Sequence, residues 1–283
     1  MAENIFQADL LKNKRILVTG GGTGLGLSMG RRFLELGARL VICGRREEVL
    51  SAAAAKLSGE TGGVVEVHVC DLRDPERVEK LVEAIYAGGP LDCLVNNAAG
   101  NFIARTEELS PRAIDSVLGI VLHGTAYCTI ACGRRWLKAG LEASVLSIVT
   151  TYAWTGSAYV VPSAMAKAGV LALTRSLAVE WGGRGIRLNA IAPGPFPTPG
   201  AWERLVPRPD LAKEFETRNP LKRVGEHIEL ANLAGYLLSD FAGFINGEVV
   251  TIDGGEWLKG AGQFNFLERL GDADWAALKP KRK

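Results

Sequence analysis

The feature that most constrains the fold is a glycine-rich run between an apolar strand and a helix. The short segment Arg15 to Thr19 predicts a strand, and residues 27–36 carry apolar side chains at helical spacing. Between them lies Thr19-Gly-Gly-Gly-Thr-Gly-Leu-Gly26. In this context glycines let the backbone approach a pyrophosphate, whose charge the helix N-terminus stabilises. The run therefore predicts a dinucleotide-binding turn made of Gly20, Gly21, Gly22, Thr23, Gly24, Leu25 and Gly26.

The rest of the chain alternates short Val/Ile/Leu runs with longer stretches of helical periodicity. Further strands are expected at residues 39–43, 64–69, 92–95, 144–149, 186–191 and 248–252. Helices are expected at residues 47–57, 75–86, 111–137, 163–181 and 228–238. Such alternation predicts an α/β fold, a single doubly wound (Rossmann) parallel sheet with helices on both faces.

Domain organisation follows from the absence of internal repeats and of a linker-like break. We expect residues 1–283 to form a single domain. Six prolines between residues 193 and 209 favour a substrate-covering loop at about 193–220 over a regular element. A C-terminal tail is expected at about 268–283, and its basic end, residues 279–283, is expected to be solvated.

Composition excludes several classes of protein. A formal net charge of +2 gives no reason to expect a nucleic-acid or anionic-membrane partner. Five cysteines without zinc-like spacing indicate reduced, buried thiols and no metal site. The N-terminus resembles no targeting signal, and no membrane insertion is expected. We therefore expect a cytoplasmic protein.

The end of the second strand indicates which cofactor would bind. An NAD enzyme places an acid about 20 residues after the glycine run to accept the ribose 2′-hydroxyl. Here Arg45 and Arg46 follow Cys43-Gly44, and two guanidinium groups suit a 2′-phosphate. The sequence thus predicts NADPH, although Glu47 and Glu48 are rival partners for both arginines and both could also be a solvated helix start.

Several motifs, in order, make the chain resemble the short-chain dehydrogenase/reductase family over nearly its whole length. They are the glycine run at 19–26, Asp71 after the third strand, Asn96-Asn97-Ala98-Ala99-Gly100, Lys167 in the late helix and Pro193-Gly194. The resemblance implies that Asp71 contacts the adenine and Lys167 the nicotinamide ribose. It also assigns cofactor contacts to Asn97, Ala98, Gly100, Pro193, Gly194, Pro195, Phe196 and Thr198.

The usual catalytic set of that family is altered here. Its active-site tyrosine, four residues before the lysine, falls at Ser163, and its helix asparagine falls at Val121. Thr150 stands at the place of its serine. Valine donates no hydrogen bond, and an aliphatic hydroxyl is a far poorer acid than a phenol, whose pKa is about 10. Ordinary carbonyl reduction is therefore disfavoured.

One branch of the family, the 2,4-dienoyl-CoA reductases of the mitochondrial type, lacks the same tyrosine. The chain resembles this branch in residues 96–102, in Thr151-Tyr152 before Thr155-Gly156-Ser157, in Val160-Val-Pro-Ser-Ala164 and in Asp253-Gly-Gly-Glu256. The resemblance implies Tyr152 as the catalytic phenol, with Ser163 and Lys167 on one helical face. His123, before Gly124-Thr125, matches the position expected for a second donor to the thioester oxygen.

The same resemblance suggests a substrate and an assembly. It implies an acyl-CoA thioester, with Arg73, Phe102, Ser110 and Arg204 on the substrate side, and a homotetramer formed through the long central helix and the late helix. Two other interpretations remain open at this point. One is reduction of another carbonyl or enone, with Tyr159 or Tyr152 as the acid. The other is a non-catalytic NADPH-binding scaffold or sensor.

Overall fold

The central parallel sheet positions the candidate site residues, many of which follow directly after its strands. The computed structural model describes residues 6–206 and 208–278. Its seven strands pair in the order β3-β2-β1-β4-β5-β6-β7, and every neighbouring pair is parallel. They are β1 (Arg15–Thr19), β2 (Arg39–Gly44), β3 (Val65–Val69), β4 (Cys93–Asn96), β5 (Ala143–Ile148), β6 (Ile186–Pro193) and β7 (Val249–Ile252). The predicted doubly wound fold is confirmed.

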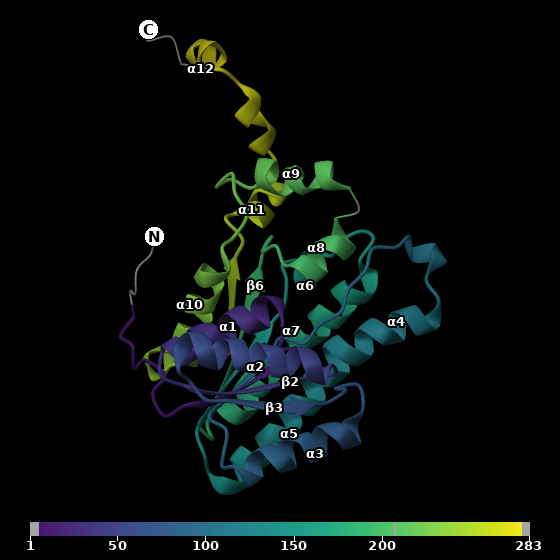
Figure 1. The fold of residues 1–283 in the computed structure, drawn as a ribbon. Coiled ribbons are helices and arrows are strands. Elements are labelled where there is room, and N and C mark those ends of the chain that lie inside the picture. The colour runs from purple at the N-terminus through teal and green to yellow at the C-terminus, as the bar shows by residue number, and fades with distance from the viewer. Residues whose placement is uncertain (1–5, 207, 279–283) are drawn as a thin grey trace.

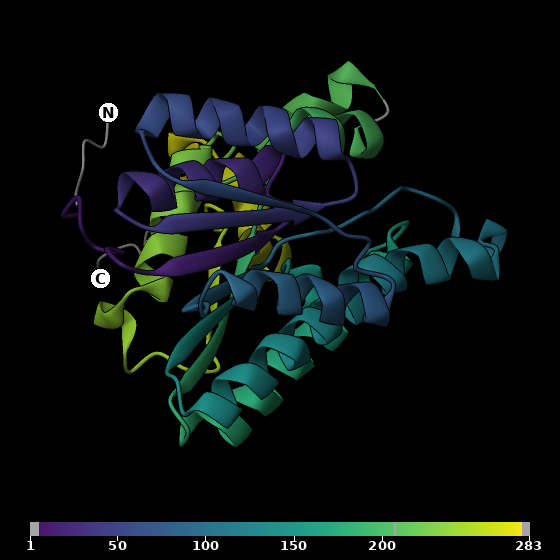
Figure 2. The ribbon, with the colours of Figure 1, turned by 60° about the horizontal axis from the view of Figure 1, so that its bottom comes forward.

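Helices cover both faces of this sheet (Figures 1 and 2). On one face lie α1 (Gly24–Glu35), α2 (Glu47–Thr61) and α10 (His227–Leu238), which share an apolar core with alternate strand residues such as Ile16 and Val18. The other face carries α3 (Pro75–Ala87), α5 (Gly124–Ala139) and α7 (Val161–Gly182), packed on Leu17 and Leu94. Successive strand side chains point to opposite faces, so both layers are apolar.

The order of the strands determines where ligands can bind. The chain moves outward from β1 to β2 and β3, then crosses back to β4 beside β1. In parallel sheets of this kind, ligands bind beyond the carboxyl ends of the strands, at such a switch point. The glycine run, Asp71, Asn97, Thr150 and Gly194 each follow a strand at this edge.

The long central helix differs from the single regular helix expected at 111–137. It begins as α4 (Pro111–Leu118), passes through one π-helical turn at Gly119–His123, and continues as α5. By length and hydropathy the run Pro111–Ala139 could cross a membrane, but half of its apolar 18-residue window is buried within the protein, as in a core helix. A π turn adds a residue to the helix and commonly marks functional sites.

The expectation of an irregular loop at 193–220 was wrong. The segment contains two short helices, α8 (Pro199–Leu205) and α9 (Pro209–Arg218). A proline opens each of them, which is favourable because the first helical N–H has no partner within the helix. Prolines that seemed to exclude regular structure therefore start it. A third unpredicted helix, the single turn α6 (Tyr152–Thr155), follows β5.

The C-terminal segment leads away from the sheet. After β7 come α11 (Glu256–Ala261), a 3-10 turn at Asn265–Arg269 and α12 (Asp272–Leu278), drawn in yellow in Figure 1. Shorter 3-10 turns lie at Thr106–Glu108 and Asp240–Ala242. Part of the predicted tail is thus helical, and residues 279–283 lie outside the described part of the chain.

All five cysteines are free thiols and are buried. Burial raises the pKa of Cys93 and of Cys132 to about 12, because a thiolate loses its hydration in the core. The pKa of Cys128 is also raised by burial. These side chains pack in the two apolar layers.

Candidate active site

The glycine turn has the backbone shape that only glycine adopts easily. Gly20 and Gly24 have left-handed φ values of 65° and 55°. A Cβ added to Gly26 would lie 2.5 Å from the Gly20 carbonyl oxygen. Helix α1 starts at Gly24, its N-cap Thr23 provides no side-chain cap, and its first turn has no acidic residue. The first N–H groups of α1 are therefore suited to an anion such as a pyrophosphate.

Asn97 and Ala98, which follow β4 directly, hold this turn in place by hydrogen bonds. The side-chain amide of Asn97 donates to the Thr19 carbonyl at 2.9 Å, and its backbone N–H donates to Thr19 Oγ1 at 3.0 Å. The backbone N–H of Ala98 donates to the same hydroxyl at 3.0 Å. These two residues thus fix the position of the glycine turn, whereas Gly100 lies on the next stretch of chain, where a Cβ would meet Ile120 at 3.6 Å.

The segment after β6 crosses the glycine turn from the other side. A Cβ on Gly24 would lie 3.2 Å from Thr198 Cγ2, so Thr198 lies directly against the start of α1. The His227 imidazole joins the same parts of the fold, with Nδ1 2.8 Å from Ser28 Oγ and Nε2 2.8 Å from the Pro197 carbonyl. Of the predicted cofactor contacts, Thr198 and the glycine run are therefore brought together.

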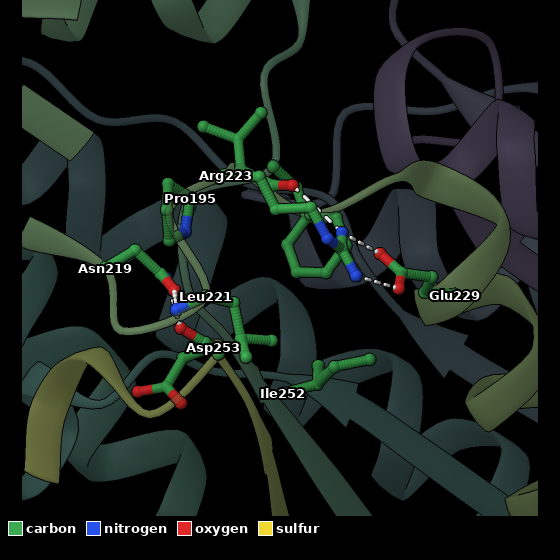
Figure 3. A pocket seen from close by; sticks show the side chains of 11 residues that line it. Pro195, Asn219, Leu221, Arg223, Glu229, Ile252 and Asp253 are labelled. Carbon is green, nitrogen blue, oxygen red and sulfur yellow. Dashed lines mark hydrogen bonds and ion pairs between the residues drawn. The ribbon is translucent and has the colours of Figure 1, made fainter. Parts of the chain in front are cut away.

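Behind Pro195 and Phe196 lies a small cavity of about 90 Å³ (Figure 3). A bidentate ion pair between Arg223 and Glu229 closes one side of it. Phe196 is buried, and a Cβ on Gly225 would clash with its ring. The cavity thus lies against the segment from Pro193 to Phe196, two of whose residues line it.

Asp71 and Arg73 pair with each other at the end of β3. Arg73 Nε and Nη2 donate to the Asp71 carboxylate at 2.9 and 2.5 Å. The Arg73 guanidinium holds the pKa of that carboxyl below its usual range. Arg73 therefore lies beside the predicted adenine contact, and its guanidinium is already engaged.

Arg45 and Arg46 stand exposed just beyond β2. Within residues 6–206 and 208–278, no ion pair joins either arginine to Glu47 or Glu48, the rivals that the sequence suggested. The two guanidinium groups create a positive site for an anionic group, and that of Arg45 also interacts electrostatically with Asp71.

The structure brings Tyr152 and Ser163 into contact. The Tyr152 hydroxyl lies 3.0 Å from Ser163 Oγ, and Ser163 is buried. Asn101, which sequence reasoning missed, directs its Nδ2 to the same phenol oxygen at 3.5 Å. Its position directly after the 96–100 motif, at the carboxyl edge of β4, is the signal that could have identified it.

Lys167 lies on α7, one helical turn after Ser163. Its ammonium donates to the Ile148 carbonyl, and its side chain is buried. Burial lowers the pKa of Lys167 to about 8, because the charged form loses hydration. The hydroxyl of Thr150, two residues after β5, is buried and has no hydrogen-bond partner among the described residues. A buried orphan hydroxyl suits a ligand that can complete its hydrogen bond.

His123 is not brought into contact with this group. It ends the π turn with an exposed side chain, and its ring centroid lies 6.0 Å from that of Tyr127. In the described structure no hydrogen bond joins His123 to Tyr152, Ser163 or Lys167. The rival phenol of Tyr159 is 60% exposed.

The predicted substrate-side residues have different environments. Ser110 caps α4, since its Oγ accepts a hydrogen bond from the Ala113 N–H at 3.2 Å. Phe102 packs on the apolar cluster of Val117, Val121 and Val149. Arg204 is exposed in the last turn of α8.

An open, mainly apolar groove of about 330 Å³ lies between Ile103 and the helices α8 and α9. It is lined by Ile103, Leu205, Val206, Leu211, Glu214, Phe215 and Arg218. Ile103 follows by two residues Asn101, whose amide donates to the Tyr152 hydroxyl. The Phe215 ring packs on Trp202 at 5.0 Å and joins the two short helices.

Together these groups can support charge stabilisation at a substrate oxygen. A phenol, a side-chain amide and a buried ammonium lie near one edge of the sheet, next to a turn shaped for a pyrophosphate. Preorganised donors of this kind stabilise an oxyanion that develops during reaction.

Comparisons with known proteins identify the family that the chain resembles. A family model described as enoyl-(acyl carrier protein) reductase matches residues 20–256. A probable 2,4-dienoyl-CoA reductase 3, (3E)-enoyl-CoA-producing, of Caenorhabditis elegans is 43% identical over 95% of this chain and 86% of its own length. A probable 2,4-dienoyl-CoA reductase of Bacillus subtilis, named (2E)-enoyl-CoA-producing, is 42% identical over 88% of this chain and 98% of its own length.

Solved structures show the same fold. A short chain dehydrogenase from Bacillus anthracis superposes with a TM-score of 0.79 at 43% identity, over 86% of this chain and 96% of its own. A gluconate 5-dehydrogenase from Burkholderia cenocepacia, in complex with NADP and tartrate, gives a TM-score of 0.83 at 28% identity, over 89% and 98% of the two chains.

Proposed function

The chain belongs to the short-chain dehydrogenase/reductase family and is an NAD(P)-dependent oxidoreductase, and from this premise we propose that it reduces 2,4-dienoyl-CoA to 3-enoyl-CoA with NADPH in fatty-acid β-oxidation. The observation that carries the proposal is the hydrogen-bonded contact of Tyr152 with Ser163, at 3.0 Å. The phenol that the family usually places four residues before Lys167 is supplied here by the turn after β5.

NADPH is the cofactor of this proposal, and when bound it supplies the hydride. The first turn of α1 would hold its pyrophosphate, and Arg45 with Arg46 would hold its 2′-phosphate. Lys167 would donate to the nicotinamide ribose. The NADP in the related gluconate 5-dehydrogenase structure supports this choice of cofactor.

The proposed chemistry requires donors at the thioester oxygen. Hydride addition at C5 of the dienoyl group sends negative charge to that oxygen and forms a dienolate. Tyr152 Oη and Asn101 Nδ2 would donate to this oxyanion, and the Lys167 ammonium would favour it by charge. Ser163 would hold the phenol in place.

We assign the second donor to Asn101 instead of His123. The Asn101 amide reaches the Tyr152 hydroxyl, whereas the His123 side chain is exposed beside Tyr127. Two donors that lie together can serve one oxygen, which is the geometry that an oxyanion site needs.

The acyl-CoA handle is supported by the groove beside α8 and α9. Its apolar walls suit a fatty-acyl chain that enters past Asn101 and Ile103. We propose that Phe102 lines the entrance and that Arg204, whose side chain is exposed, meets CoA phosphates. Arg73 is less suited to that role because Asp71 already engages it, and Ser110 serves as a helix cap.

The position of the remaining double bond is a separate question, since the names of the worm and Bacillus relatives differ in it. Protonation of the dienolate at C2 leaves a 3-enoyl product, and protonation at C4 leaves a 2-enoyl product. Donors held at the thioester oxygen lie next to C2, which favours the 3-enoyl product. NMR of the isolated product distinguishes the two.

The decisive experiment is turnover of NADPH with 2,4-hexadienoyl-CoA. We expect loss of both the NADPH and the dienoyl absorbance. Tyr152→Phe should lower kcat by roughly 10²- to 10³-fold, the effect of removing one oxyanion donor, without changing NADPH affinity. The matched control is Tyr159→Phe, which removes an exposed phenol and should leave kcat unchanged.

Three outcomes would contradict the proposal. Faster turnover of a ketone or enone panel would favour reduction of another carbonyl substrate, and tight NADPH binding without any turnover would favour a scaffold or sensor. An unchanged rate in Tyr152→Phe would remove this phenol from the chemistry. The cytoplasmic location expected from the sequence stays a prediction, which cell fractionation tests.

A further inference from the structure

The turn that carries Tyr152 is too short to hold its own orientation. Helix α6 has four residues, Tyr152–Thr155, and its N-cap Thr151 makes no side-chain cap. A single helical turn is not stable alone, so its orientation must come from tertiary contacts. One of these is the Tyr152 to Ser163 hydrogen bond.

A second contact leaves the same turn on the side chain of Trp154. This indole packs edge to face against Trp257, with ring centroids 5.9 Å apart and planes at 86°. Edge-to-face geometry is favoured by the ring quadrupoles. Trp154 is 40% exposed, and the ring of Trp257 is the aromatic contact that the structure gives it among the described residues.

Trp257 is itself firmly placed. Its backbone N–H donates to Asp253 Oδ2 at 2.9 Å, and the Gly255 N–H donates to Oδ1 at 2.8 Å. Asp253 is only 8% exposed, and its backbone carbonyl accepts from Asn219 Nδ2 at 2.7 Å (Figure 3). A charged group with its hydrogen bonds made in a buried position keeps a fixed geometry.

The turn at Asp253 also contacts the segment after β6, which is expected to face the nicotinamide. The Gly194 N–H donates to the Ile252 carbonyl at 2.9 Å, and a Cβ on Gly194 would lie 2.7 Å from Asp253 Cβ. A continuous series of contacts thus runs from the segment after β6, through Asp253 and Trp257, to Trp154 and the Tyr152 turn.

We propose that the contact between Trp154 and Trp257 is a positioning contact. It holds the Tyr152 phenol at a fixed position relative to the segment from Pro193 to Phe196, which is expected to face the nicotinamide. Among the described residues, neither indole makes a hydrogen bond to Tyr152, Ser163 or Lys167. The C-terminal segment after β7 thereby takes part in the reaction, through the orientation of α6. This inference rests on the role of Tyr152 given under the proposed function.

The test compares Trp154→Ala, Trp257→Ala and the double variant. Loss of an aromatic pair should lower kcat for 2,4-hexadienoyl-CoA by roughly two- to tenfold, with the NADPH dissociation constant unchanged. Because both variants remove one contact, their effects should not add in the double variant. Trp257→Phe keeps a ring edge and should restore most of the rate. Trp275→Ala, in α12, is the matched control and should behave as the wild type.

A readout without turnover separates this proposal from the proposed function. In protein labelled with 3-fluorotyrosine, the resonance of residue 152 is the one that Tyr152→Phe removes. That resonance should shift or broaden in Trp257→Ala and recover in Trp257→Phe. An unchanged resonance in Trp257→Ala, additive rate losses, or the same loss in Trp275→Ala would overturn the positioning role. If the resonance moves but no variant reduces the dienoyl thioester, the positioning role stands and the proposed function fails.

Discussion

At the scale of single residues, the central feature is that Ser163 stands four residues before Lys167, where the family usually has a tyrosine, and that the Tyr152 hydroxyl lies 3.0 Å from Ser163 Oγ. The sequence placed Ser163 and Lys167 on one helical face, and the family resemblance implied Tyr152, just after a strand, as the phenol. The contact between the Tyr152 and Ser163 hydroxyls comes from the structure. Asn101 could not be predicted in the same way. Its approach depends on the path of an extended segment, which has no periodic pattern. The family resemblance pointed to His123 as the second donor, but its side chain is exposed at the end of the π turn.

Lys167 should make cofactor binding depend on pH. Its pKa of about 8 lies below the ordinary lysine value, so the ammonium is present below about pH 8 and lost above it. We expect the NADPH dissociation constant to rise roughly three- to tenfold between about pH 7 and about pH 9. Fluorescence titration across this range measures it. Lys167→Met removes the titrating group and should abolish the pH dependence; the same rise in that variant would show that another group is responsible.

Arg45 and Arg46 should decide between NADPH and NADH. The double change Arg45→Ala/Arg46→Ala removes charge-assisted hydrogen bonds to the 2′-phosphate and should lower kcat/KM for NADPH by roughly ten- to hundredfold. Values for NADH should stay nearly constant, since NADH lacks that phosphate. Arg134→Ala, which breaks a surface ion pair with Glu79, is the control. Equal losses with both cofactors would contradict 2′-phosphate recognition.

At the scale of elements, the strands were predicted to within about two residues because parallel strands buried on both faces read as continuous apolar runs. The π turn was not predicted, because the residues Gly119 to His123 carry no pattern that distinguishes it from a regular helix. The two helices α8 and α9 were hidden by prolines that serve both as helix starts and as loop residues.

The glycine turn offers a sharp test with an internal control. Gly26→Ala would place a Cβ 2.5 Å from the Gly20 carbonyl oxygen, so we expect NADPH affinity to fall at least about tenfold and stability to fall by about 1–3 kcal/mol. Gly59 lies in α2 with open space around it, and Gly59→Ala should stabilise the fold by about 0.5–1 kcal/mol. Calorimetry and cofactor titration measure both. Equal behaviour of the two variants would contradict the close packing of the turn.

The groove beside α8 and α9 should set chain-length preference. Leu211→Trp would fill part of it, and we expect kcat/KM for a long dienoyl-CoA to fall roughly tenfold while that for 2,4-hexadienoyl-CoA is kept. Val64→Trp adds the same bulk at an exposed position next to β3 and should change neither. A chain-length series measures the ratio. Parallel loss for short and long substrates would place the acyl chain elsewhere.

At the scale of the whole molecule, we expect four chains to associate through the central helix and α7. Val179 lies on α7 and is 87% exposed in the single chain, so its apolar side chain is available to a partner that packs on this helix. Light scattering should give about four times the 30.3 kDa chain mass. Val179→Arg should lower that mass without changing the unfolding of the single chain. A monomeric wild type would refute the expectation.

The buried cysteines have a consequence for the covalent chemistry of the folded protein. Electrophiles react with thiolates, and burial in the two apolar layers keeps all five sulfurs protonated and out of reach. A thiol reagent would therefore measure how often the chain opens, and each labelled position would report the layer that had separated. The enzyme carries its own set of reporters for partial unfolding, distributed over both sides of the sheet.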